Sequence, residues 1–194
     1  GIGRFPVRTE KEASTIVSKI KNYVANKDKG IWKNNLGFIA DDLITGLNYA
    51  PANEDDHFLN TETYTNTIQS GYPDFMINKI YLDTYPREIT ANGGRYPDAQ
   101  KVLFDKLNSG LLLLNYVGHG GTASWTHEYL LTMQDVEGLS NKRLPLLITA
   151  TCDFGRWDAN DVSGGEKFLL NSKGVAIALF TTARVVYGGS NHRL

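Results

Sequence analysis

Hydrophobic residues recur along the chain in two alternating patterns, a helical spacing and short continuous runs. Across residues 9–26 they fall three or four positions apart, which predicts an amphipathic helix with Thr9 as its N-cap. Residues 36–40 form an apolar run that ends at Asp41 and Asp42. This run predicts a buried strand with carboxylates at its C-terminal end.

The same alternation continues to the C-terminus and defines the fold class. Residues 43–56 are polar without clear periodicity, and the Thr and Asn content of the next segment makes it a weak helix former. Further helices are predicted at residues 57–69, 97–108, 132–139 and 165–171, and strands at 75–82, 111–117, 144–151 and 174–182. Alternating strands and helices predict an α/β fold, a mainly parallel sheet with helices on both faces. No linker or repeat divides residues 1–194, so we expect one domain.

Composition and charge narrow the possible partners. The 194 residues include 20 basic and 21 acidic side chains, a formal net charge of −1. Such a balance provides no field that would attract nucleic acid. No apolar run approaches the roughly 20 residues of a membrane helix. The first four residues resemble neither a signal peptide nor an initiator end, so we expect a piece of a longer protein.

Two predicted strands run directly into polar tips. Residues 111–117 lead into Gly118-His119-Gly120-Gly121, and residues 144–151 lead into Cys152 and Asp153. Ligands of open α/β sheets bind outside the carboxyl ends of the strands. If the two strands are neighbours, His119 and Cys152 face each other.

A histidine beside a cysteine suits acyl transfer. The imidazole of His119 would favour the thiolate of Cys152 and protonate a leaving amine. The glycines leave room for a backbone N–H, such as that of Gly120, to approach an oxyanion. The alternative is a non-catalytic α/β module that binds a peptide or an anion and keeps Cys152 as a buried thiol. A serine hydrolase is disfavoured because the chain has no Gly-x-Ser-x-Gly elbow.

The remaining polar residues carry weaker signals. Four aspartates, at positions 41, 42, 55 and 56, are hard oxygen ligands, but their spacing fits no cation-binding loop. The alternative for such acidic runs is a solvated loop. We therefore expect no metal and no cofactor. We also expect His127 and His192 to be ordinary surface or loop histidines.

The segments around the two tips resemble the gingipain family of cysteine peptidases. The resemblance rests on residues 115–125, Asn-Tyr-Val-Gly-His-Gly-Gly-Thr-Ala-Ser-Trp, and on Cys152, thirty-three positions after His119. Within that family, residues 149–156, 163–166 and 178–184 resemble the peptidase and sortase of the type IX secretion system. The resemblance covers nearly the whole chain and implies the caspase-like fold.

Carried over by position, the resemblance implies roles for individual residues. It implies His119 as general acid and base, Cys152 as nucleophile, and the amides of Gly120 and Cys152 as oxyanion donors. An acidic residue that orients the histidine is matched by Asp42 or its neighbour Asp41, of which Asp42 is favoured. The substrate pocket is matched by Asp55, Asp56 and His57. Trp125 also matches a family tryptophan near the substrate, although a packing wall is the commoner role of such a residue.

The resemblance also implies a cellular role. It implies removal of the C-terminal sorting signal of secreted cargo proteins, with transfer of the acyl group to an amine of lipopolysaccharide as an alternative to hydrolysis. Other type IX secretion components would be partners, at the bacterial cell surface and its outer membrane. Because family members continue beyond the point where this sequence ends, we expect the catalytic domain to be incomplete at its C-terminus.

Overall fold

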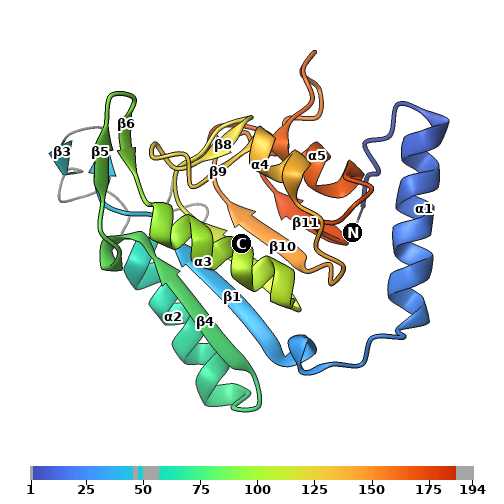
Figure 1. The fold of residues 1–194 in the computed structure, drawn as a ribbon, viewed down its shortest axis with the longest axis horizontal. Helices are drawn as coiled ribbons and strands as arrows, with labels where there is room; N and C mark the ends of the chain where they lie inside the picture. Colours follow the sequence, from blue (N-terminus) through green and yellow to red (C-terminus); the bar gives the residue numbers. More distant parts are fainter. Residues whose placement is uncertain (1, 46–47, 50–56, 187–194) are drawn as a thin grey trace.

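The computed structural model describes residues 2–45, 48–49 and 57–186, and it is built around a five-stranded parallel sheet (Figure 1). Five helices accompany the sheet. The helices are α1 (Glu10–Ala25), α2 (His57–Gly71), α3 (Pro97–Ser109), α4 (Met133–Gly138) and α5 (Gly164–Leu170). The sheet strands are β1 (Asn35–Ala40), β4 (Met76–Tyr81), β7 (Leu113–Val117), β10 (Leu146–Ala150) and β11 (Ala178–Thr181).

The order of the strands places the two predicted tips side by side. The sheet runs β11-β10-β7-β1-β4, and every neighbouring pair is parallel. Strand β7 therefore lies in the centre, between β1 on one side and β10 on the other. Because all five strands point the same way, their carboxyl ends share one edge of the sheet.

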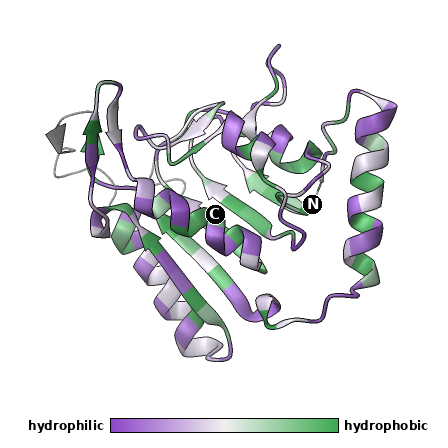
Figure 2. Cartoon of the chain, viewed as in Figure 1, coloured by the Kyte–Doolittle hydropathy of each residue, from purple (hydrophilic) through white to green (hydrophobic). Residues whose placement is uncertain are grey.

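Helices cover the two faces of the sheet unequally. On one face, the buried side chains of α3, α4 and α5 join those of the strands in one apolar core that includes Leu103, Leu114, Leu147 and Phe168. Residues of opposite parity on the strands, such as Phe38, face the other way, where α2 packs across β1, β4 and β7. Figure 2 shows hydrophobic residues concentrated in the strands between these helices.

Helix α1 forms as the sequence predicts and stands at the margin of the molecule. The hydroxyl of Thr9 accepts from the amide of Glu12, and the Glu12 carboxylate accepts from the amide of Thr9, which completes a capping box. The helix packs mainly against α5, and Ile16 is its buried residue. Most of its other apolar side chains stay partly or fully exposed.

Helix α2 forms despite a sequence rich in Thr and Asn. The hydroxyls of Thr61 and Thr65 donate to the carbonyls of His57 and Glu62, so both side chains are buried without losing hydrogen bonds. Packing against the sheet thus overrides a low intrinsic propensity.

The predicted strand at residues 174–182 is shorter than expected, because only residues 178–181 pair with β10.

Short elements outside the sheet went unpredicted. Antiparallel pairs join β2 (Ile44–Thr45) to β3 (Asn48–Tyr49), β5 (Glu88–Thr90) to β6 (Gly93–Arg95), and β8 (Ser124–Trp125) to β9 (Leu131–Thr132). Two 3-10 turns, Ile31–Asn34 and Leu82–Thr84, precede β1 and follow β4. These pieces are too short to show a hydrophobic period.

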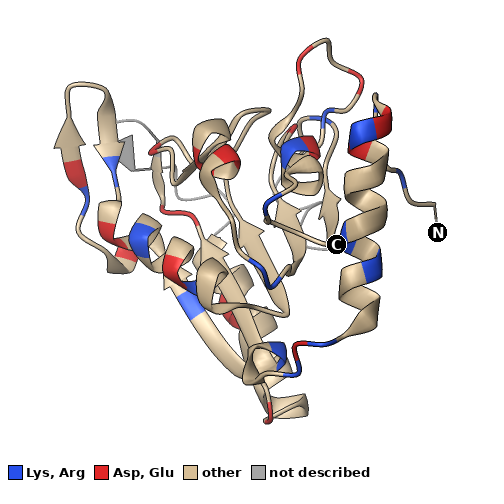
Figure 3. Cartoon of the chain, turned by 45° about the vertical axis from the view of Figure 1, so that its right-hand side comes forward, with Lys and Arg blue, Asp and Glu red and all other residues tan. Residues whose placement is uncertain are grey.

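Charge is mixed over the surface. Lys and Arg lie beside Asp and Glu on both α1 and α3 (Figure 3), in keeping with the formal net charge of −1. In the part of the chain that the structure describes, no helix has the length and apolar character needed to cross a membrane.

Candidate active site

Three strands end at the same level on one edge of the sheet. Val117 at the end of β7 is paired with Ala40 at the end of β1 and with Ala150 at the end of β10. The backbone ladder extends one residue further. The amide N–H of Asp41 donates to the carbonyl of Val117 at 3.0 Å, and the amide N–H of Gly118 donates to the carbonyl of Ala150 at 3.2 Å. The residues that follow these ends therefore form one site.

His119 is positioned through its backbone by a buried carboxylate. Its amide N–H donates to Oδ2 of Asp41 at 2.8 Å, and the hydroxyl of Tyr116 donates to the same oxygen at 3.3 Å. The Tyr116 hydroxyl also lies against the carbonyl of His119, which accepts from the amide of Thr126 at 2.9 Å. The backbone N–H and C=O of His119 are thus both satisfied, which fixes the position of its backbone at the tip.

Two glycines of the tip are required by close packing. A Cβ at Gly118 would overlap Cβ of Asp41 and the hydroxyl of Tyr116, and a Cβ at Gly120 would overlap Oγ1 of Thr151. The tip therefore packs directly against the residue that precedes Cys152. Only glycine lets these side chains approach the backbone of the tip so closely.

Cys152 begins a sharp turn after β10. Its side chain is half-buried rather than buried, and its thiol lies 3.5 Å from the carbonyl of Val186. The next residue, Asp153, has a φ of 53°, in the left-handed region that L residues seldom adopt. This turn directs the chain away from the sheet edge immediately after Cys152 and leaves the thiol accessible.

The two amides expected to bind an oxyanion have no acceptor within the described chain. Gly120 and Trp125 face each other in an antiparallel bridge, and the two hydrogen bonds of that bridge are made by the residues next to them. The amide of Gly121 donates to the carbonyl of Ser124, and the amide of Thr126 donates to the carbonyl of His119. The amide N–H of Gly120 is therefore left over, and that of Cys152 likewise donates to no described residue. Such N–H groups can stabilise a developing negative charge on a substrate oxygen.

The contacts favour Asp41 over Asp42 as the carboxylate that acts on His119, which corrects our expectation. The two carboxylate oxygens of Asp42 accept from the amide of Ile44, at 3.0 Å, and from the hydroxyl of Tyr96. An oxygen of Asp41, in contrast, lies within 4.8 Å of a ring nitrogen of His119. The sequence could not separate the two because they are adjacent.

Burial gives Asp41 an unusual electrostatic setting. Its side chain is 2% exposed, and loss of water raises the pKa of its carboxyl well above the ordinary value. The amide N–H groups of His119 and Asp42 oppose that increase, whereas the neighbouring charges of Asp42 and Glu128 add to it. Asp41 is thus a strongly held hydrogen-bond acceptor at the base of the site.

An ion pair that the sequence did not reveal lies beside these aspartates. Arg87, between β4 and β5, donates to Glu128 at 2.9 Å, and both side chains are largely buried. Burial and the charge of Asp42 raise the pKa of Glu128, and Arg87 partly offsets them. Glu128 Oε1 accepts this bond, whereas Oε2 is buried with no described partner. No local spacing links these positions, so only the fold brings them together.

Three histidines gather at the tip. The ring of His119 lies 5.2 Å from that of His57, edge to face at 87°, and 5.0 Å from that of His127. His57, at the start of α2, thus lies beside His119, and its role in a substrate pocket stays a prediction. His127 is exposed as expected, although its ring also packs on His119. Asp55, Asp56 and His192 lie outside the described residues.

Trp125 belongs to the core and does not contact the site surface, which corrects its assignment as a substrate-binding residue. Its side chain is 0% exposed. It stacks on Tyr116 at 4.4 Å and 13°, and it also contacts Phe154 and Phe168. A substrate could reach this indole only if the core opened, so Trp125 supports the tip from beneath, as a packing wall.

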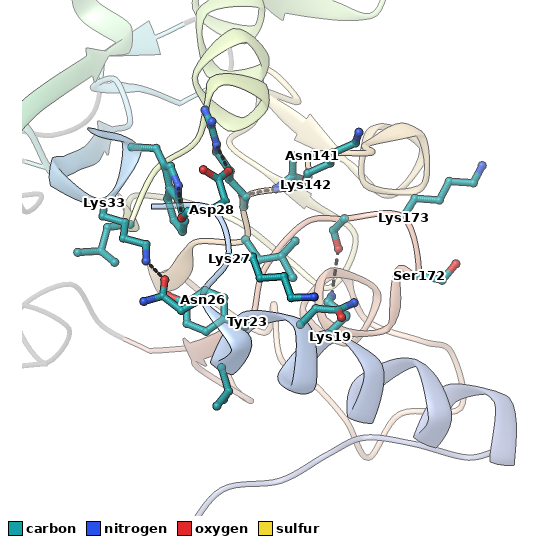
Figure 4. Close-up of a pocket in the computed structure, with 17 residues that line it drawn as sticks. Lys19, Tyr23, Asn26, Lys27, Asp28, Lys33, Asn141, Lys142, Ser172 and Lys173 are labelled. Atoms are coloured by element: carbon teal, nitrogen blue, oxygen red, sulfur yellow. Dashed lines mark hydrogen bonds and ion pairs between the residues drawn. The ribbon is translucent and has the colours of Figure 1, made fainter. Parts of the chain in front are cut away.

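A separate cavity of about 640 Å³ lies at the opposite edge of the sheet (Figure 4). It is lined by the C-terminal part of α1 and by segments that precede the strands, including Trp32, Leu112 and Leu144. Lys19, Lys27, Lys33 and Lys173 lie around it (Figure 4). Because it adjoins the amino ends of the strands, it is distinct from the site of His119 and Cys152.

Comparison with solved structures confirms the caspase-like α/β fold. The crystal structure of the Arg specific cysteine proteinase gingipain R superposes with a TM-score of 0.76 and 19% identity, covering 99% of this chain and 42% of that one. The complex of Porphyromonas gingivalis RgpB pro- and mature domains gives 0.75 and 20%, covering 99% and 43%. A third structure, of a protease, gives 0.68 and 18%, covering 96% and 37%.

The chain thus spans less than half the length of these solved proteins. Comparison with curated proteins finds no significant match. The model of peptidase family C25 matches residues 1–194. Since that match extends over the whole sequence, the chain belongs to peptidase family C25, a family of cysteine-type peptidases.

Proposed function

We propose that this chain carries the catalytic centre of a cysteine endopeptidase. The observation that carries the proposal is the register of β7 and β10, which places His119 and Cys152 each two residues beyond the paired ends Val117 and Ala150. Neighbouring strands of a sheet lie about 4.8 Å apart, so the two side chains start from adjacent positions on one edge. A thiol and an imidazole placed in this way form a nucleophile and its base.

The reaction proceeds through a thioester. His119 takes the thiol proton, and the thiolate of Cys152 attacks the carbonyl carbon of the scissile peptide bond, so that the oxygen becomes negatively charged. The free amides of Gly120 and Cys152 stabilise that oxygen. The C–N bond then breaks, and the departing amine takes the proton from the His119 imidazolium.

The second half of the reaction releases the acyl group. An acceptor, either water or an amine, loses a proton to His119 and attacks the thioester carbon, and the sulfur leaves as a thiol once it is reprotonated. Hydrolysis and transpeptidation share this intermediate and differ only in the acceptor. Asp41 contributes by holding the His119 peptide in place throughout.

The proposed substrates are secreted cargo proteins, from which the enzyme removes a C-terminal sorting signal in the manner of PorU. The segments at residues 149–156, 163–166 and 178–184 support this finer assignment through their resemblance to that protein. In this proposal the amine acceptor is on lipopolysaccharide. The enzyme then works at the bacterial cell surface, in the outer membrane, with other type IX secretion components.

Substitution of the two central residues tests the peptidase assignment. Cys152→Ala and His119→Ala should each abolish cargo processing, because the first lacks the nucleophile and the second its base. Both variants should unfold within a few degrees of the wild type, since neither side chain is in the apolar core. Full processing of cargo in cells that carry only Cys152→Ala would overturn the assignment.

The acceptor is tested separately. Mass analysis of the new cargo C-terminus, with and without an added amine, distinguishes a free carboxylate from an amide. Amide formation supports the sortase step, whereas a free carboxylate under every condition would limit the enzyme to hydrolysis.

A further inference from the structure

The two histidines and the buried carboxylate of the site converge in a way that the peptidase reaction does not require. One oxygen of Asp41 and one ring nitrogen each of His57 and His119 all lie within 4.8 Å of one another. The three residues come from the end of β1, the start of α2 and the tip after β7. The fold therefore brings three potential ligands to one point from three separate elements.

The chemistry of this set suits a borderline divalent ion. Neutral imidazole and carboxylate are the usual ligands of Zn²⁺, and sites with three protein ligands leave a fourth position open. Metal–ligand bonds of about 2.1 Å at tetrahedral angles separate ligand atoms by roughly 3.4 Å. The three atoms must therefore approach by at most about 1.4 Å, a change that two partly exposed imidazole rings can make by side-chain rotation.

The carboxylate is already held for such a role. Oδ2 of Asp41 accepts from the amide of His119 and the hydroxyl of Tyr116, and Oδ1 accepts from the amide of Asp42. A ligand oriented by outer hydrogen bonds binds a metal more tightly than a free one. The half-buried rings of His57 and His119 give the ion a path from solvent.

We infer that Asp41, His57 and His119 form an inhibitory binding site for a transition-metal ion of the Zn²⁺ class. A bound ion would occupy the nitrogen lone pair with which His119 accepts the proton of Cys152. The inhibitory consequence rests on the proposed peptidase function, whereas the binding site itself does not.

Calorimetric titration of the Cys152→Ala protein with ZnCl₂ tests binding without any need for activity. We expect one ion per chain, and at least about a tenfold loss of affinity in each of the Asp41→Asn, His57→Gln and His119→Gln backgrounds. The matched control is His127→Gln, because this histidine also packs on His119 but lies outside the three-ligand group. That variant should bind Zn²⁺ as its parent does.

The results separate the two proposals. Absence of saturable binding, or equal binding by the His57→Gln protein, would overturn the metal site whatever the activity of the enzyme. With the wild type, Zn²⁺ should inhibit peptide cleavage, and a chelator should restore it. An inactive wild type that still binds one ion through these residues would overturn the peptidase proposal and keep the metal site.

Discussion

At the scale of single residues, the site depends on a carboxylate that binds a backbone amide. Asp41 accepts from the amide N–H of His119 through one oxygen and from that of Asp42 through the other. An asparagine would offer one oxygen and one NH₂ group, so one of those two donors would face another donor. Asp42 differs, because one of its partners is the hydroxyl of Tyr96, which can reverse its role and accept.

This difference predicts unequal effects of the same substitution at neighbouring positions. Asp41→Asn should lower kcat/KM by roughly 10- to 100-fold, the equivalent of one hydrogen bond to a charged group, about 1.5–3 kcal/mol. Asp42→Asn should have a much smaller effect and lower kcat/KM by less than about threefold. Steady-state cleavage of a peptide substrate by both variants measures the contrast, and a larger loss at Asp42 would restore our first assignment.

The accessible thiol supports a second prediction at the residue scale. If His119 stabilises the thiolate, iodoacetamide should alkylate Cys152 faster than a model thiol at pH 6, since the thiolate is the reactive form. His119→Ala should remove that advantage, and mass spectrometry follows both reactions. A sluggish wild-type reaction would favour the peptide- or anion-binding module that the sequence left as an alternative.

At the scale of elements, the sequence predicts what periodicity and long runs can reveal. The five sheet strands and five helices were all foreseen, because burial imposes a hydrophobic pattern on the successive residues of each element, although β11 begins four residues later than predicted. The β5–β6 and β8–β9 pairs were not, since strands of two or three residues leave no pattern. The partnership of Arg87 with Glu128 also requires the fold, as the two are 41 positions apart.

The glycine-rich tip after β7 provides a prediction for an element. Gly118→Ala should destabilise the protein by about 1–3 kcal/mol, because the added methyl group overlaps Asp41 and Tyr116. Activity should fall further than stability, since the displaced peptide carries His119. Denaturant unfolding and peptide cleavage measure the two effects.

The same tip contains the control for that experiment. A Cβ at Gly121 meets no atom within 4 Å. Gly121→Ala should therefore change stability by less than about 0.5 kcal/mol and leave cleavage nearly intact. Equal losses in the two variants would show that backbone flexibility, and not the close approach at Gly118, makes the tip sensitive.

At the scale of the whole molecule, one lysine joins the marginal helix α1 to the sheet domain. Nζ of Lys19 donates to the carbonyls of Leu169 at 2.8 Å and Gly174 at 3.0 Å, beside the end of α5. The carbonyls at a helix C-terminus lack partners within the helix, so a cation there satisfies them. Ile16 is the buried residue of α1 in the described part of the chain, and the Arg8–Glu166 ion pair at 3.1 Å lies just before the helix.

Burial lowers the pKa of Lys19 to about 8 from an ordinary value of 10.5, which makes its contribution depend on pH. Between these two values the unfolded chain binds more protons at this position than the folded protein does, so the free energy of unfolding rises with pH through that window. Lys19→Met has no such group and should lack that increase. Thermal unfolding of both proteins from pH 7.5 to 10.5 measures this rise in stability. At pH 7.5, hydrogen exchange should also show faster opening of α1 in the variant, because the carbonyls of Leu169 and Gly174 lose their donor. Parallel stability curves for the two proteins would mean that Lys19 is solvated like a surface lysine and that α1 is held by its apolar contacts alone.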